Sequence, residues 1–261
     1  MSSLKTHAYN FWRYRYLLQD LVNRDIKVKY RRSVLGIVWS VLNPLLMMLV
    51  TTLVFSHLFR FEVEFFAVFF LTGSLIFNFM ATATGDAMTS ILGSAGLIKK
   101  VYIPKYIFPL EKCVFALVNV LFSLIALFGV IIFVGMPIPW TIVLLPIPIF
   151  LTFIFSVGLG LILATLAVFF RDITHLYSVL IQAWMFLTPV IYPVEILPIW
   201  LRQLMVFNPM YRYVSYFRDV TMYGVVPGMQ ENLNSLGFAL VFLVLGMAVY
   251  RWKQHQLVLH M

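Results

Sequence analysis

Long apolar runs recur along nearly the whole chain, and they limit its possible folds more than any other feature. The first run, Val34–Phe59, is long enough as a helix to cross the roughly 30 Å of hydrocarbon in a bilayer. The others are Phe65–Ala83, Ile107–Val134, Trp140–Phe170, Ile173–Ile191 and Ser235–Tyr250. Charged residues make up 11% of the chain, against about 25% in soluble proteins. The sequence therefore predicts an all-α integral membrane protein with six transmembrane helices.

Basic residues are concentrated in the segments that would share one side of the membrane. Eight lie before residue 33, and Lys99, Lys100 and Lys105 lie between the second and third runs. Cytoplasmic loops are enriched in Lys and Arg, so we expect a multi-pass protein of the cytoplasmic (inner) membrane with both termini in the cytoplasm. Basic patches also attract nucleic acid, but a position beside the first span favours an orientation signal, and no nucleic-acid partner is expected.

The chain divides into a cytoplasmic N-terminus, residues 1–33, and a six-helix transmembrane domain, residues 34–261. In the N-terminus, Phe11, Tyr14, Leu18 and Leu21 recur at helical spacing with polar residues between them. This pattern predicts an amphipathic helix in the membrane interface, where aromatic rings lie at headgroup level. Such a helix could serve as a simple anchor or as a gate, and the residues alone favour neither.

The segment between the fifth and sixth runs, residues 192–234, contains two apolar stretches that are each too short to cross the bilayer. Asn208-Pro209 separates them and favours a turn. Backbone at membrane depth must be paired internally or line a cavity. We therefore expect two re-entrant half-helices that dip in from the outer face.

The sequence offers few groups for chemistry. It has no phosphate-binding Gly-x-x-x-x-Gly-Lys-[Ser/Thr] loop and no His-Glu-x-x-His motif, and Cys113 is its one cysteine. Its five histidines are scattered, and the carboxylates Asp86, Glu111 and Asp172 fall near the predicted cytoplasmic boundary. These observations predict no catalytic residue, no metal site and no cofactor bound by the chain. Ion coupling would need ionisable groups within the spans, so the energy is expected to come from outside the chain.

Two further features admit a functional and a simpler reading. Aromatic residues form 17% of the chain; single rings usually serve packing or interfacial belts, but together they suit a conduit for sugar rings. The cytoplasmic loop 91–106 is basic and glycine-delimited. It could act only as an orientation signal, or it could form a short helix that lodges in a groove of a soluble partner.

Residues 24–45, RDIKVKYRRSVLGIVWSVLNPL, resemble the start of the first span in ABC-2-type permeases that export polysaccharides. These permeases are the membrane subunits of O-antigen, capsular polysaccharide and teichoic acid transporters. Lys99–Pro109 looks like the coupling segment of that family, and Asn208–Tyr211 resembles the link between its two half-helices. Phe170–Ile173 and Thr188–Pro193 resemble the two ends of its fifth span. The resemblance extends over nearly the whole chain.

The resemblance implies a permease without an ATP site, working as a homodimer with two copies of a separate ABC ATPase that binds ATP and Mg. The substrate would be a lipid-linked glycan that enters from the membrane lipid. The residues implied for coupling to the ATPase are Gly96, Leu97, Lys99, Lys100, Tyr102, Pro104 and Lys105. Those implied for the substrate gate are Trp12, Arg13, Tyr14, Arg15, Tyr16, Arg24, Lys27 and Arg31. Those implied for the channel lining are Trp39, Phe66, Phe70, Phe77, Trp184, Tyr192 and Tyr211.

Three other functions make different demands on the sequence. An ABC-2 permease for a small hydrophobic drug or lipid would need a closed apolar cleft rather than a continuous aromatic lining. A membrane-bound glycan or lipid transferase would need carboxylates or histidines gathered at one membrane face, and the sequence shows no such group. A non-transport scaffold would leave the loop 91–106 and the half-helices unexplained.

Overall fold

The computed structural model describes residues 2–31, 33–58, 63–101 and 103–257, with side chains from residue 14 onward except at positions 56–58. All regular structure within these ranges is helical. The α-helices are α1 (Ser2–Tyr30), α2 (Trp39–Leu58), α3 (Phe66–Gly93), α4 (Ala95–Ile98), α5 (Ile107–Val134), α6 (Pro146–Phe169), α7 (Ile173–Leu187), α8 (Ile199–Met205), α9 (Pro209–Arg218) and α10 (Met229–Lys253). Short 3₁₀ turns cover Gly36–Val38, Trp140–Leu144 and Val194–Ile196, and a π-helical turn, Asp219–Tyr223, follows α9.

Five of these segments are long and apolar enough to cross a membrane: Gly36–Phe55, Phe66–Gly93, Ile107–Val134, Trp140–Phe169 and Met229–Lys253. The fifth predicted span, Ile173–Ile191, is helical only over the 15 residues of α7. That helix stops at Leu187 because the next residue, Thr188, precedes Pro189, and a residue before proline is driven out of the helical conformation; Thr188 has φ −105° and ψ 128°. The chain is thus an all-helical membrane protein with five long apolar helices.

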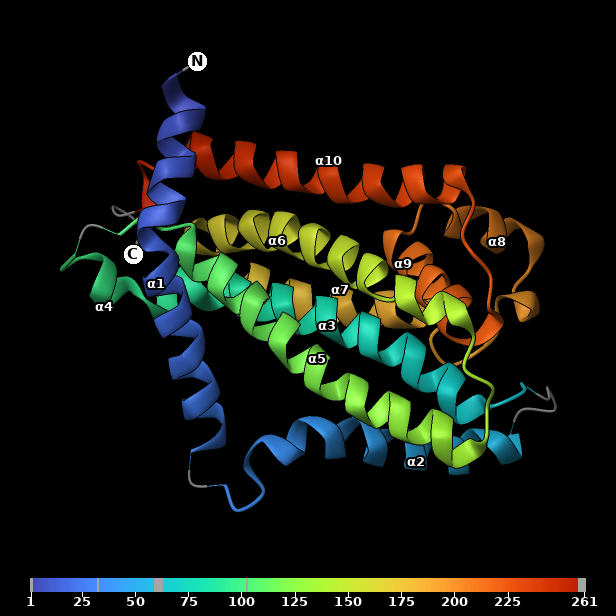
Figure 1. Cartoon of the computed structure of the whole chain (residues 1–261). Helices are drawn as coiled ribbons and strands as arrows, with labels where there is room; N and C mark the ends of the chain where they lie inside the picture. The colour runs from blue at the N-terminus through green and yellow to red at the C-terminus, as the bar shows by residue number, and fades with distance from the viewer. Residues whose placement is uncertain (1, 32, 59–62, 102, 258–261) are drawn as a thin grey trace.

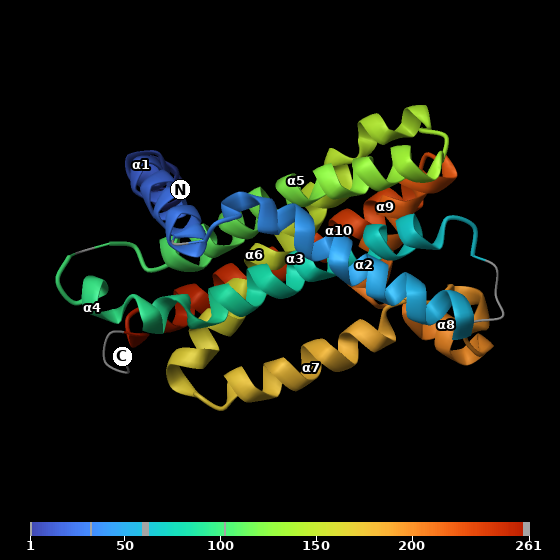
Figure 2. The same cartoon turned by 90° about the horizontal axis from the view of Figure 1, so that it is seen from below.

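The helices α3, α5 and α6 form the centre of the bundle, as Figures 1 and 2 show. Helix α10 packs along α6, and α2 packs on α5 and α3 on the opposite side. In its most apolar window, α3 has 72% of its residues buried, whereas α2 has 11%. Helices α2, α7 and α10 therefore present apolar surface outward, as expected for helices in contact with lipid or with another chain.

The helix α1 crosses one end of the bundle at a steep angle, and we call this the N-terminal end (Figure 1). The short helix α4 and the end of α10 lie at the same end, while α8 and α9 lie at the opposite end. The amphipathic pattern predicted around residues 11–21 is part of one longer helix. Over its described side chains, Leu21 and Val22 are buried while Gln19 and Asp20 are exposed, so one face of the helix lies against the bundle there.

Two glycines bring α6 and α10 into direct backbone contact. A Cβ built on Gly246 would overlap the carbonyl oxygen of Gly158, and one built on Gly158 would overlap the backbone of Phe242 and Leu243. Helices in lipid gain little from burying apolar surface against each other and depend on close packing, for which small residues are needed. The glycine pair therefore fixes both the spacing and the register of α6 and α10.

We expect Gly246→Ala to destabilise the protein by about 1–3 kcal/mol, because the added methyl group forces two backbones apart. The measurement is thermal unfolding of the purified protein in detergent. Gly237→Ala is the matched control in the same helix, since a Cβ there meets no atom within 4 Å. The control should leave the melting temperature unchanged or raise it, and equal losses for both variants would contradict this account.

Candidate functional site

Within the described ranges, no three residues of the types His, Cys, Asp and Glu come together as metal ligands would. The Cys113 thiol lies fully buried in the bundle core. The chain presents surfaces and polar contacts between helices. Its candidate functional parts are the α1 contact, the coupling segment, the aromatic residues and the junction of α7 with α9.

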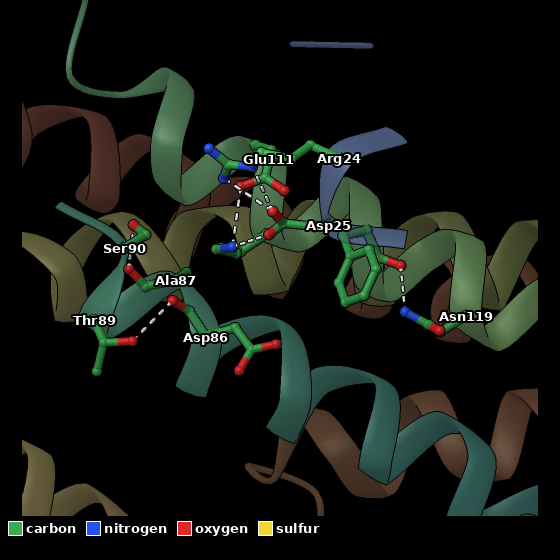
Figure 3. A network of polar contacts seen from close by, with 10 residues as sticks. Arg24, Asp25, Asp86, Ala87, Thr89, Ser90, Glu111 and Asn119 are labelled. Carbon is green, nitrogen blue, oxygen red and sulfur yellow. Dashed lines mark hydrogen bonds and ion pairs between the residues drawn. The ribbon is translucent and has the colours of Figure 1, made fainter. Parts of the chain in front are cut away.

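The α1 contact rests on an ion pair between Asp25 of α1 and Lys112 of α5, which Figure 3 shows from close by. Arg24 also reaches Asp25 at 2.9 Å, and Glu111, which is 1% exposed, lies 3.4 Å from the Lys112 ammonium. Burial alone would raise the pKa of Asp25, but hydrogen bonds from Lys112 and Arg24, together with their charges, hold it below its usual value. The carboxylate therefore stays ionised until the pH falls below the ordinary range of an aspartate.

A second set of polar contacts fixes the end of α1 to α5 and to the start of α2. Lys29 Nζ donates to Asn119 Oδ1 at 3.0 Å, and the Tyr30 hydroxyl donates to the same oxygen at 3.1 Å. Tyr30 also hydrogen bonds to the Ser40 hydroxyl, and Ser123 Oγ donates to the Ser40 carbonyl at 3.0 Å. The Asn119 amide on α5 thus joins α1 and α2, two helices that the chain connects by a sharp bend.

The predicted gate residues lie on α1, except Arg31, which follows it, and those with described side chains are mostly exposed to solvent or lipid. Tyr16 is 63% exposed, and the Arg15 guanidinium covers its ring at 4.7 Å and donates to its hydroxyl at 2.7 Å. Arg24, Lys27 and Arg31 are exposed as well. Tyr14 and Arg15 line a small hollow between α1 and the start of α5, together with Leu18, Tyr106, Ile107 and Leu110. The side chains of Trp12 and Arg13 lie outside those that the structure describes.

The coupling segment, residues 91–106, contains the end of α3 and the single helical turn of α4. Ser94 N donates to Ser90 O at 3.1 Å, so the turn continues almost directly from α3. Leu97, Lys99, Lys100 and Val101 are exposed, whereas Ile98 and Ile103 are buried beneath them. Gly96 is exposed and Pro104 and Lys105 are half-buried, while Tyr102 lies outside the described residues. The segment presents a compact basic and apolar knob at the N-terminal end.

The predicted lining residues divide into two groups. Trp39 is 38% exposed, and four others are half-buried at the protein surface: Phe66, Trp184, Tyr192 and Tyr211. Phe70 and Phe77 are packed in the core instead, at 4% and 2% exposure. Their helix, α3, lies at the centre of the bundle, so these two rings pack against other helices of the same chain.

The junction of α7 with α9 is held by Asn208, which precedes α9. Its side-chain oxygen caps the helix by accepting from Met210 N at 3.0 Å and also accepts from Trp184 Nε1 at 2.8 Å. Its amide nitrogen donates to Thr188 Oγ1 at 3.1 Å. The predicted turn at Asn208-Pro209 is therefore real, and its asparagine also anchors α9 to the end of α7.

Arg218, at the end of α9, is 5% exposed and satisfies the non-helical backbone after α7. Its guanidinium donates to the carbonyls of Pro189 at 2.7 Å and Val190 at 2.9 Å, and to Phe69 O of α3 at 3.0 Å. It also covers the Phe69 ring at 3.5 Å, and Gly73 leaves room for it, since a Cβ there would lie 2.6 Å from the guanidinium. Carbonyls that leave a helix below the surface need such a donor.

Sequence reasoning missed Arg218 and Asn119 as organising residues. The available signal was the same for both: an isolated polar side chain within an apolar or aromatic stretch, which has to find a partner inside the protein. The ion pair of Asp25 with Lys112 carried no comparable signal, because its members come from segments far apart in the sequence.

The fold and these contacts define a multi-pass helical membrane protein whose basic knob extends beyond the bundle. Residues 16–222 match the family described as ABC-2 type transporter, and the chain belongs to that family. This confirms the resemblance seen in the sequence. Permeases of this family lack a nucleotide-binding domain, so ATP hydrolysis belongs to a partner ATPase.

Curated relatives cover most of the chain. It is 35% identical over 184 residues to the O-antigen export system permease protein RfbA of Myxococcus xanthus, covering 70% of this chain and 71% of that protein. It is 29% identical to the RfbA protein of Klebsiella pneumoniae over 240 residues, 90% of each chain. It is 22% identical to the polysialic acid transport protein KpsM of Escherichia coli over 250 residues, 91% of this chain and 93% of that protein.

A double-mutant cycle tests whether the ion pair holds α1. We expect Asp25→Asn and Lys112→Gln to show a coupling energy of about 1–3 kcal/mol in thermal unfolding, because both side chains are largely buried. Asp25→Asn combined with Arg24→Gln is the control pair. Arg24 is 54% exposed, so its coupling should stay below about 1 kcal/mol. Strict additivity of the Asp25 and Lys112 changes would mean that the pair does not fix α1.

Replacing the buried guanidinium should be more damaging than replacing an exposed one. Arg218→Met should lower the free energy of unfolding by at least about 2 kcal/mol, because the Pro189 and Val190 carbonyls lose their donor. Arg202→Met on the neighbouring helix α8 is the control, since Arg202 is exposed and the carbonyls that it contacts can turn to water. The assignment fails if both variants melt at the temperature of the unmodified protein.

Proposed function

We propose that this chain is the membrane permease of an ATP-driven exporter that carries a lipid-linked polysaccharide, of O-antigen or capsular type, across the cytoplasmic membrane. The observation that carries the proposal is the family match over residues 16–222. Export permeases for O-antigen and polysialic acid align with about nine-tenths of the chain and of their own length. The exposed basic coupling segment and the aromatic surface residues support it independently.

The proposal includes six membrane crossings. The helix α7 would be the fifth, although its 15 residues reach only about 22 Å. Its extension through the buried residues Thr188–Val190 brings the chain closer to the full thickness. The position of α1, α4 and the end of α10 at one end of the bundle supports an even number of crossings with both termini in the cytoplasm (Figure 1).

In this topology the helix α1, within the segment 1–33, lies in the inner interface, and residues 34–261 form the transmembrane domain. Residues 192–234 would lie in the outer leaflet, with α8 and α9 as the two re-entrant half-helices. The buried side chain of Arg218 and the cap at Asn208 support that depth, because they provide the internal partners that backbone within a membrane requires.

The permease would work as a homodimer with two copies of an ABC ATPase, which binds ATP and Mg. Residues 91–106 would dock on the ATPase through Leu97, Lys99, Lys100 and Val101, which are exposed together at the N-terminal end. An apolar and basic knob of this kind fits a groove with apolar walls and acidic rims.

The glycan would enter beside α1, where Tyr16 and the basic residues Arg24, Lys27 and Arg31 are exposed. Their guanidinium and ammonium groups suit the phosphate that links many glycans to lipid carriers. Trp39, Phe66, Tyr192 and Tyr211 reach the protein surface and are proposed to line the path, since aromatic faces contact sugar rings without requiring charge. The burial of Phe70 and Phe77 assigns them to packing.

Deletion of the gene in its own host tests the proposal. Surface polysaccharide should be lost and lipid-linked glycan should accumulate inside the cell, and a plasmid copy of the gene should restore export. A deletion strain without a paralogue that keeps its surface glycan would refute the function. A strain that keeps the glycan but becomes sensitive to hydrophobic compounds would support the alternative, a permease for a small hydrophobic drug or lipid.

Charge reversal of the knob should weaken docking of the ATPase. We expect the double variant Lys99→Glu, Lys100→Glu to reduce co-purification of the ATPase by about tenfold or more, since two attractive contacts become repulsive. Arg171→Glu is the control, because Arg171 is exposed in the loop between α6 and α7, outside the knob. Normal co-purification of the double variant would remove the coupling role from residues 91–106.

A further inference from the structure

The last lysine of the coupling segment differs from the other two in where its side chain goes. Lys99 and Lys100 are exposed, but Lys105 is half-buried, and its Nζ donates to the backbone carbonyl of Gln254 at 2.8 Å. Burial lowers the pKa of Lys105 below its usual value. A lysine placed in this way contributes to a contact within the chain.

The acceptor of this hydrogen bond lies at the end of α10. Gln254 is the residue after the last helical residue, Lys253, and its own N–H still bonds to Tyr250 O at 2.8 Å. The final carbonyls of a helix have no N–H partner within it and carry the negative end of the helix dipole. The ammonium of Lys105 therefore caps α10 from the coupling segment, a position more than a hundred residues earlier in the chain.

A ring contact beside this hydrogen bond joins the same two parts. Tyr106, the next residue of the coupling segment, meets Tyr250 edge to face, with ring centroids 6.2 Å apart and an interplanar angle of 86°. Tyr250 is 8% exposed. Two consecutive residues of the coupling segment, Lys105 and Tyr106, thus bind the end of α10, one by charge and one by packing.

The helix α10 is in turn coupled to α6. The backbones of Gly246 and Gly158 touch directly, and the Lys253 ammonium lies 5.4 Å from the centre of the Phe169 ring at the end of α6. A displacement applied to the end of α10 consequently acts on α6 as well. The coupling segment itself continues into α3 and α5 through the chain, and Lys105 and Tyr106 connect it to α10 as well.

We propose that Lys105 is a positioning residue that connects the coupling segment to α10, so that movement driven by the partner ATPase reaches the α6–α10 pair. This inference rests on the proposed docking of the ATPase on residues 91–106. It gives Lys105 a different role from Lys99 and Lys100: it transmits movement within the permease and does not bind the ATPase.

The test uses the full complex of the permease with its ATPase. In Lys105→Met, the ATPase should co-purify as with the unmodified permease and the complex should still hydrolyse ATP. Surface polysaccharide in the deletion strain carrying this variant should fall by roughly tenfold relative to the rate of ATP hydrolysis, the scale of a lost charged hydrogen bond. Lys105→Arg should restore export, because a guanidinium can also donate to the Gln254 carbonyl.

Three outcomes would overturn the inference. The first is loss of ATPase co-purification in Lys105→Met, which would make Lys105 a docking residue. The second is an equal loss of export and ATP hydrolysis, which would indicate only a general structural role. The third is unchanged export. If Lys105→Met does not accumulate in the membrane, Tyr250→Leu removes the neighbouring ring contact and is measured in the same way, with the same result expected.

The variants of the knob separate this inference from the proposed function. If Lys99→Glu, Lys100→Glu loses the ATPase while Lys105→Met retains both the ATPase and full export, the docking proposal holds and the role of Lys105 is wrong. If the double variant binds the ATPase normally, docking on residues 91–106 itself fails, whatever Lys105→Met shows.

Discussion

The need to hydrogen-bond backbone N–H and C=O groups within the water-free core of the bilayer determines most of this structure. Long helices meet that requirement by themselves, which is why runs such as Phe66–Gly93 and Ile107–Val134 are uninterrupted. The difficulty arises where the chain leaves a helix below the surface, as it does at Thr188-Pro189-Val190. There the Arg218 guanidinium donates hydrogen bonds to the Pro189 and Val190 carbonyls. These bonds allow α7 to end and the chain to turn, so that α8 and α9 fold beside it. The arrangement of the opposite end depends on this side chain together with the contacts of Asn208.

Polar contacts are equally important at the N-terminal end, because they hold α1, which the bundle does not enclose. The helix α1 crosses the bundle and gains little from packing along it (Figure 1). Asp25 with Lys112, and Lys29 and Tyr30 with Asn119, fix it at two places along one face of α5. Within a few turns of these contacts, Lys105 binds the end of α10. The surfaces proposed for the glycan and for the ATPase are thereby attached to the same helical core.

The sequence was informative where one residue type or one apolar run determines the local structure. Apolar length located the five long apolar helices, and Asn208-Pro209 located the turn before α9. The end of α7 at Leu187 was missed because the apolar run continues to Ile191, while the geometry imposed by Pro189 ends the helix earlier. Phe70 and Phe77, which the resemblance implies for the channel lining, are buried because α5 and α6 pack on α3, and the sequence alone does not show which helices cover that face. Lys105 could not be distinguished from Lys99, since its partner carbonyl lies in a distant helix.

The contact between Gly158 and Gly246 also has a consequence for biosynthesis. The helix α6 is made well before α10, so during translation the groove at Gly158 faces lipid or the insertion machinery until α10 arrives. The Lys105 ammonium likewise cannot bond to the Gln254 carbonyl until that residue has been made. Assembly of the bundle is therefore complete only when its last helix, α10, packs on α6. The α6–α10 contact consequently stays accessible to a quality-control protease that samples partly inserted chains for longer than any contact among α2, α3 and α5.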